Sequence, residues 1–210
     1  MADKIRTAKE GRIPTTLEGI KQFYDDWAPT YEKDLAHEGY IAPRRAAEAM
    51  AKFLTNKDAE IMDIACGTGL VAQELTQQGF KHIDGVDISS ESLKICKVSG
   101  LYRRLICDSI GTNKLDINDD TYDGLIICGA LGHLSLECFP QLIRIVKPGG
   151  PIIFSVDGNS MDTFDHFKDG KFEAALQELV RNGLWIKESY ELIPDWVFNR
   201  PGHQYVYKVV

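Results

Sequence analysis

Short apolar runs alternate with segments of helical periodicity through the middle of the chain. Between the runs, apolar residues recur at helical spacing over about 70–78, 90–100 and 139–146. The runs themselves predict five strands, over residues 60–64, 83–87, 104–107, 125–128 and 152–156. The run Leu125 to Cys128 is almost continuously apolar, as expected of a central strand that is buried on both faces. This alternation predicts a mostly parallel sheet flanked by helices.

The N-terminal part of the chain adds two helices to this pattern. Residues 1–14 are charged and lack periodicity, so they are predicted to be a mobile tail. Thr15 and Glu18 fit a capping box, which predicts a helix that begins after Thr15 and ends at about Asp26. Pro43 fits the first position of a second helix.

The C-terminal part predicts one more helix and two more strands. Apolar residues are spaced for a helix over about 171–182, and alternating residues predict strands over 185–192 and 204–209. The two strands are joined without a helix, whereas the second half of a dinucleotide-binding fold would continue with strand–helix–strand units. The predicted topology of the C-terminal part therefore differs from that of a dinucleotide-binding fold.

A glycine-rich loop follows the first strand and contains the chain's clearest functional signal. The strand ends at Ile64 and runs into Gly67 and Gly69, and helix-forming sequence follows directly. Glycines allow close approach of the backbone to a ligand, and the new helix turns unpaired N–H groups toward it. Asp87 ends the next strand, 20 residues past Gly67, where a carboxylate can accept hydrogen bonds from ribose hydroxyls. Together these features predict a nucleotide-like ligand.

Two ligand classes fit this geometry, dinucleotides and S-adenosylmethionine. Residues 67–72 match the G-x-G-x-x-A pattern of dinucleotide-binding loops, so the loop alone does not decide. We expect Asp63 to lie at the mouth of the loop, where a pyrophosphate would have to bind. A carboxylate repels that anion and suits the ammonium and sulfonium groups of S-adenosylmethionine. Asp63 therefore favours S-adenosylmethionine.

Four segments resemble the motifs of class I S-adenosylmethionine-dependent methyltransferases, in the order of that family. They are Asp63 to Gly69, Gly85 to Ser89, Tyr122 to Leu131, and Val146 to Gly150. More narrowly, Phe23 to Tyr31 together with residues 63–72 is similar to the Williams-Beuren syndrome chromosomal region methyltransferase-like proteins.

The resemblance implies a fold, a cofactor and a set of site residues. The fold is Rossmann-like α/β, a seven-stranded, mostly parallel sheet with a terminal antiparallel strand. Residues 1–42 would form a tail and lid helix, and residues 43–210 the domain that binds S-adenosyl-L-methionine and yields S-adenosyl-L-homocysteine. The cofactor-binding residues we expect are Trp27, Tyr31, Asp63, Ala65, Cys66, Gly67, Gly69, Asp87, Ile88, Asp108, Ser109 and Gly129.

The acceptor side of the site is less clearly patterned. Tyr24, Asp157 and Trp196 are candidates to contact the acceptor, although the N-terminal aromatic residues could equally be packing against the core. His133 follows the fourth strand and is the candidate general base, with a structural role as the alternative. Family members that methylate amide or adenine nitrogens carry Asn/Asp-Pro-Pro-Tyr where this chain has residues 128–131, Cys-Gly-Ala-Leu, which weighs against those acceptors.

Composition limits the classes of partner and the cellular compartment that we expect for this protein. The net charge of −7 argues against a nucleic-acid or anionic-membrane partner. Five cysteines without CxxC spacing indicate reduced thiols, and neither an apolar leader nor a membrane-length apolar run is present, so we expect a cytoplasmic protein. No ligand spacing indicates a metal. We expect a monomer that methylates a small molecule or a protein side chain.

Two alternative functions remain at this point. The chain could bind S-adenosylmethionine or S-adenosylhomocysteine with little turnover, or it could be an NAD-type oxidoreductase.

Overall fold

The computed structural model describes residues 2–111 and 113–210, and in it seven strands form a single sheet. Its order is β3-β2-β1-β4-β5-β7-β6, and β7 runs antiparallel to its neighbours β5 and β6. The strands are β1 (Glu60–Ile64), β2 (His82–Asp87), β3 (Arg104–Cys107), β4 (Gly124–Cys128), β5 (Pro151–Asp157), β6 (Trp185–Val197) and β7 (Arg200–Val209). This confirms the predicted seven-stranded, mostly parallel sheet.

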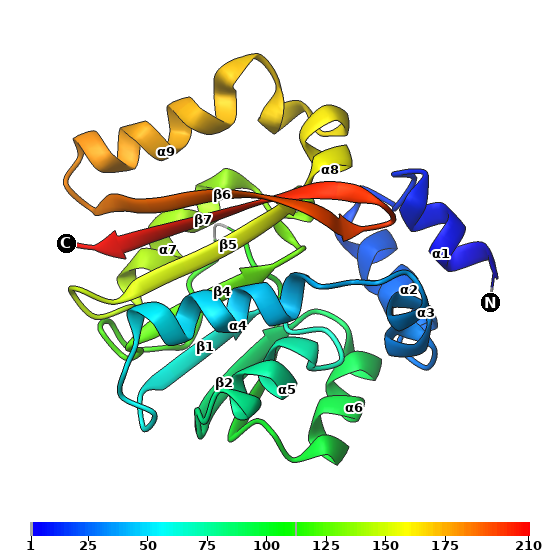
Figure 1. Ribbon diagram of the computed structural model, residues 1–210, viewed down its shortest axis with the longest axis horizontal. Coiled ribbons are helices and arrows are strands. Elements are labelled where there is room, and N and C mark those ends of the chain that lie inside the picture. The colour runs from blue at the N-terminus through cyan, green and yellow to red at the C-terminus, as the bar shows by residue number, and fades with distance from the viewer. Residues whose placement is uncertain (1, 112) are drawn as a thin grey trace.

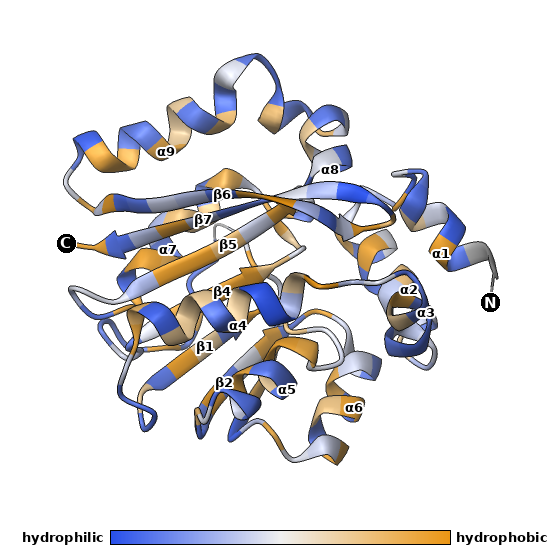
Figure 2. Ribbon diagram, in the orientation of Figure 1, coloured by the Kyte–Doolittle hydropathy of each residue, from blue (hydrophilic) through white to orange (hydrophobic). Residues whose placement is uncertain are grey.

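Alternate residues of the central strands face two separate cores, one on each side of the sheet. In β1, Met62 and Ile64 belong to one cluster of buried residues and Ile61 to the other. One face is covered by α4 (Ala42–Phe53) and α5 (Leu70–Gln77), and the other by α7 (Phe139–Arg144) and α9 (Lys171–Arg181). In Figure 2 the central strands are largely hydrophobic, whereas α4 and α9 alternate between hydrophobic and hydrophilic residues.

Three N-terminal helices form a separate group at one end of the sheet, as Figure 1 shows. They are α1 (Ala2–Lys9), α2 (Leu17–Trp27) and α3 (Tyr31–His37). The expectation of a mobile tail over residues 1–14 is wrong for α1, because Ile5 and Ala8 pack against a cluster that includes Phe23, Trp27 and Trp196. The N-cap of α2 is Thr16 rather than Thr15, and its side chain accepts a hydrogen bond from the Gly19 N–H.

The remaining helices are short and connect the strands. They are α6 (Ser90–Ser99), α8 (Gly158–Thr163), η1 (Leu131–His133), η2 (Leu136–Cys138) and η3 (Asp165–Gly170). The predicted terminal strands prove longer than expected, and β6 and β7 form a hairpin whose turn packs against the N-terminal helices. That contact brings residues near 196 close to residues near 27.

Candidate functional site

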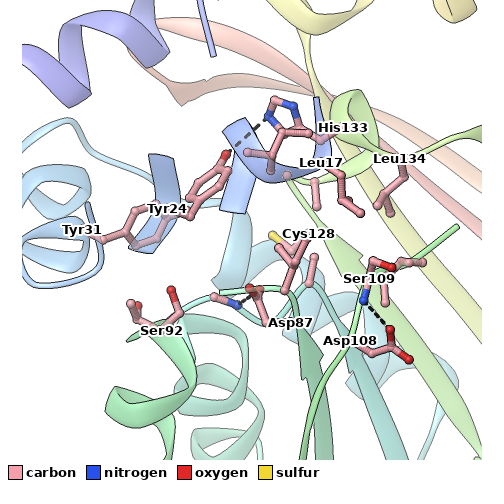
Figure 3. A pocket seen from close by; sticks show the side chains of 18 residues that line it. Leu17, Tyr24, Tyr31, Asp87, Ser92, Asp108, Ser109, Cys128, His133 and Leu134 are labelled. Carbon is pink, nitrogen blue, oxygen red and sulfur yellow. Dashed lines mark hydrogen bonds between the residues drawn. The ribbon is translucent and has the colours of Figure 1, made fainter. Parts of the chain in front are cut away.

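A cavity of about 810 Å³, partly open to solvent, lies at the carboxyl ends of the parallel strands. Its floor is the glycine loop after β1 with the segments that follow β2, β3 and β4, and residues of α2 and α3 lie over it (Figure 3). Eight of the twelve expected cofactor-binding residues line it: Tyr31, Ala65, Gly67, Asp87, Ile88, Asp108, Ser109 and Gly129. A cavity therefore lies at the edge of the sheet where the sequence predicts the ligand.

The glycine loop adopts backbone conformations that need its glycines. Gly67 and Gly69 have φ angles of 54° and 101°, and Gly69 caps the N-terminus of α5. A side chain built on Gly67 would meet no atom within 4 Å, so this stretch of backbone borders open space. A ligand can therefore approach the loop closely.

The Asp87 carboxylate holds the glycine loop in place while it lines the cavity. The Gly67 N–H donates to Oδ2 at 2.8 Å, and the Ser89 N–H donates to Oδ1 at 2.7 Å. Burial raises the pKa of Asp87, and these two hydrogen bonds oppose the increase. Each carboxylate oxygen can accept a further hydrogen bond from a ligand hydroxyl.

Asp63 does not lie at the mouth of the loop, so that expectation is wrong. It is 1% exposed and does not line the cavity, and the Tyr102 hydroxyl donates to its Oδ2 at 2.6 Å. Strand alternation explains this placement, because Asp63 shares a face of β1 with the buried Ile61. Asp63 is therefore buried beneath the sheet edge, hydrogen-bonded to Tyr102, and does not line the cavity.

Burial raises the pKa of Asp63 to about 7, which predicts a pH-dependent stability. In the unfolded chain its pKa is about 4, so between about pH 4 and 7 only the folded chain keeps the proton. The free energy of unfolding should then decrease by about 1 kcal/mol per pH unit in this window. Urea unfolding at pH 5 and 6.5 should show this loss in the wild type and not in Asp63→Asn. An identical pH dependence in the two proteins would show that Asp63 does not carry this proton.

Three other expected cofactor residues also lie outside the larger cavity. Cys66 is buried next to Cys96 and Leu93, and Gly69 serves as the helix cap. Trp27 faces a second cavity, and its indole N–H donates to Asp34 at 2.9 Å.

The aromatic N-terminal helix is bound to the cofactor side of the sheet. Asp25 of α2 accepts hydrogen bonds from the Ser89 hydroxyl at 2.7 Å and from the Glu91 N–H at 3.2 Å, at the N-terminus of α6. Lys21 donates to the same carboxylate at 2.6 Å. These contacts hold Tyr24 over the cavity, as a lid requires. The sequence analysis missed Asp25, although unpaired N–H groups at a helix N-terminus favour a carboxylate.

A second cavity, of about 650 Å³ and also partly open to solvent, adjoins the first. Tyr24, Tyr31, Gly129 and His133 line both. The other two expected acceptor-side residues, Asp157 and Trp196, line only the second. The structure thus brings the three expected acceptor residues together in the wall of the second cavity, and Tyr24 lines the first cavity as well.

His133 lies between the two cavities, but it is a weak base. Burial lowers its pKa to about 4, so the imidazole is neutral near pH 7 and has little affinity for a proton. Its Nε2 lies 3.4 Å from the Tyr24 hydroxyl, as the dashed line in Figure 3 shows. His133 is therefore suited to hydrogen bonding and poorly suited to general-base catalysis.

Gly129 lines both cavities, and a side chain at this position would be strained. Its φ is 70°, and an added Cβ would lie 2.6 Å from the Tyr40 hydroxyl. Gly129→Ala should lower the free energy of unfolding by about 1 to 3 kcal/mol, through backbone strain and this contact. Gly183→Ala is the matched control in urea unfolding, because Gly183 has a φ of 69° and open space around it. Equal losses in the two variants would show that the Tyr40 contact costs nothing.

Several lining residues were not expected from the sequence. They are Leu17, Ile20, Thr68, Ser92, Ile110, Cys128, Ala130 and Leu134. Thr68 adds a polar group, since its hydroxyl is buried without a partner among the described residues. The position of Thr68 between Gly67 and Gly69 is the feature of the sequence that could have identified it as a lining residue.

No group of three or more metal-ligating side chains is assembled in the part of the chain that the structure describes. Within that part, no helix has the length and apolar character to cross a membrane.

Comparison with known proteins agrees with this geometry. The family described as "Methyltransferase domain" matches residues 61–150. The human Methyltransferase-like protein 27 is 38% identical over 167 residues, covering 78% of this chain and 66% of the relative, slightly less than two thirds of its length. The central part of the chain is therefore similar to the class I S-adenosylmethionine-dependent methyltransferases. The predicted fold is confirmed, and this similarity supports the expected enzyme class and cofactor.

Solved structures of this methyltransferase fold resemble the whole chain. The [4+2]-cyclase SpnF has a TM-score of 0.69 at 16% identity, covering 94% of this chain and 98% of that one. The Burkholderia thailandensis 1,6-didemethyltoxoflavin-N1-methyltransferase, solved with S-adenosylhomocysteine, has a TM-score of 0.64 at 18% identity, covering 89% and 87%. At these identities the likeness concerns the fold alone, and one of the two proteins is a cyclase. The activity of this chain must therefore be argued from its own site.

Proposed function

We propose that the larger cavity binds S-adenosylmethionine and that the chain transfers its methyl group to an acceptor in the second cavity. The observation that carries this proposal is the charge of the cavity wall. Asp87 and Asp108 are its charged side chains, and no lysine or arginine is among the described residues that line it. Such a wall suits a ligand with an ammonium and a sulfonium group, and it offers a pyrophosphate no cation.

The wall also offers the hydrogen-bonding groups that such a nucleoside needs. Asp87 would accept from the ribose hydroxyls, and Asp108 with Ser109 lies at the neighbouring strand end, where the family resemblance places the adenine. The unpartnered Thr68 hydroxyl is available to the amino acid end. Backbone N–H groups of the glycine loop can also donate hydrogen bonds to this ligand.

When bound, the cofactor supplies an activated methyl group, so the protein has only to position the acceptor and exclude water. Tyr24 and Tyr31 close the cavity from the lid side. Gly129 lines both cavities and adds no side chain to either. We propose residues 1–42 as the lid unit and 43–210 as the cofactor domain.

Calorimetric titration tests the ligand. We expect S-adenosylhomocysteine to bind the purified chain and NADH not to bind, because the wall offers a pyrophosphate no cation. Tighter binding of NADH would instead support an oxidoreductase.

Methyl transfer needs a separate test. The chain and a limiting concentration of S-adenosylmethionine are added to a cell extract, and an acceptor that gains 14 Da should appear faster with the wild type than with Asp87→Ala. If S-adenosylhomocysteine binds but no acceptor gains mass, the alternative of a binding protein with little turnover is favoured. A cytoplasmic location and a monomeric state stay predictions, and light scattering after size-exclusion chromatography tests the second.

A further inference from the structure

The second cavity has an unusually aromatic wall. Seven of its seventeen described lining residues are Phe, Tyr or Trp, contributed by the N-terminal helices, the region around Phe164, and the end of β6 with its turn. Trp196 is 2% exposed, and its indole N–H is buried without a partner among the described residues. Tyr40 packs edge-on against it, with ring centroids 5.5 Å apart. A wall of this kind favours a flat ring, stacked or edge-on, with a hydrogen-bond acceptor for the indole.

The same wall carries a single negative charge. Asp157 lines the cavity, and no lysine or arginine is among the described lining residues. Lys9 lies 5.3 Å from the ring centroid of Phe198 but is paired with Glu38. Burial raises the pKa of Tyr24, and the negative charge of Asp157 raises it further. Asp157 therefore acts electrostatically on a residue that lines both cavities. An anionic acceptor would therefore be repelled, and a cation would be stabilised by Asp157 and the aromatic faces.

We propose that the second cavity takes a small heteroaromatic acceptor and that it is methylated on a ring nitrogen whose lone pair is free at neutral pH. This inference rests on the proposed methyltransferase function. The nitrogen lone pair forms a bond to the methyl carbon while the carbon–sulfur bond breaks and its electron pair stays on sulfur. The positive charge passes from sulfur to the ring, and no proton has to leave before the new bond forms.

Other acceptor classes fit the cavity less well. A hydroxyl group needs a base, and the buried His133, with its pKa lowered to about 4, is a weak one. A phenolate or carboxylate would face Asp157 without a compensating cation. An aliphatic ammonium has no free lone pair, and a neighbouring carboxylate favours its protonated form. A ring nitrogen avoids all three difficulties.

Two matched probes test this charge preference on the full chain saturated with S-adenosylhomocysteine. N-Methylisoquinolinium and 2-naphthoate each have two fused six-membered aromatic rings, and they carry opposite charges. We expect the cation to bind at least about tenfold more tightly than the anion, as judged by calorimetry. Equal binding, tighter binding of the anion, or binding of neither probe would overturn the proposal.

Three variants assign the preference to Asp157. Asp157 caps α8 by accepting a hydrogen bond from the Ser160 N–H at 3.1 Å, and asparagine keeps that cap. Asp157→Asn should therefore lower the cation-to-anion ratio severalfold, leaving the part that the aromatic faces contribute, whereas Asp157→Glu should retain the wild-type ratio. Asp162→Asn removes the same charge from an exposed position on α8 and should leave the ratio unchanged. A wild-type ratio in Asp157→Asn would overturn the assignment.

The same samples separate this inference from the proposed function. If S-adenosylhomocysteine itself does not bind, the proposed function fails. If it binds and the charge preference is absent, only the acceptor class is wrong.

Discussion

Replacement of Asp87 by alanine should weaken the binding of S-adenosylhomocysteine by about 1 to 3 kcal/mol, which is roughly 5- to 150-fold. The variant loses the proposed acceptor for the ribose hydroxyls. It also leaves the Gly67 and Ser89 N–H groups without the carboxylate that holds them. Both losses act at the cofactor side, so the dissociation constant from calorimetry is the quantity to measure.

Two further variants separate these contributions. Asp87→Asn keeps one oxygen acceptor and should bind with intermediate affinity. Glu178→Ala removes an exposed carboxylate on α9 and should bind like the wild type. An unchanged dissociation constant in Asp87→Ala, with the fold intact by circular dichroism, would remove Asp87 from the site.

Replacement of Phe154 by alanine should lower the free energy of unfolding by about 3 to 5 kcal/mol. Phe154 lies in β5, is fully buried and packs against an aromatic cluster that joins β5 and β7 to the helices on one face. Its ring centroid lies 5.3 Å from that of Phe139, 5.2 Å from that of Tyr205 and 5.7 Å from that of Tyr207. Removing the ring leaves a cavity that these neighbours only partly fill.

Urea unfolding measures this loss, and Val98→Ala is its control. Val98 is an apolar residue of α6 that is 89% exposed, so its truncation should change the free energy of unfolding by less than about 0.5 kcal/mol. Similar losses in the two variants would contradict the packing account. The strand β5 ends at Asp157, and its Ser155 carbonyl accepts a hydrogen bond from the Gly129 N–H. Packing around Phe154 therefore also helps to position these two residues in the wall of the second cavity.

The sequence predicted the sheet and the floor of the larger cavity well, because local signals determine both. Apolar runs mark the strands, and in a parallel sheet the residues at their carboxyl ends meet at one edge. Asp87 and Asp108 could therefore be placed together from the sequence alone. Asp63 was misplaced, although the two-residue period of a strand put it on the same buried face as Ile61.

The second cavity could not be built from the sequence in the same way. Its walls combine residues near 24–40 with residues near 157–198, which come together only through packing between the N-terminal helices and the turn of the β6–β7 hairpin. The helix α1 depends on the same contacts, since its few apolar residues gain a partner only in the folded chain. Contacts between segments so far apart in the chain cannot be predicted from a local sequence pattern.

The feature that favours S-adenosylmethionine over a dinucleotide differs between the sequence prediction and the structure. A single carboxylate, Asp63, was expected to exclude a pyrophosphate, whereas we now propose that the whole wall of the cavity does so, with Asp87 and Asp108 and no described lysine or arginine. The conclusion is the same, but it now depends on the charge of a surface.

A crystal structure of the chain grown with S-adenosylhomocysteine is the most direct test of the central claim, that the cavity at the glycine loop holds this nucleoside. We expect the ribose hydroxyls within about 3 Å of the Asp87 carboxylate and the homocysteine sulfur on the side of Gly129. Density for the ligand elsewhere, or a ribose remote from Asp87, would contradict it.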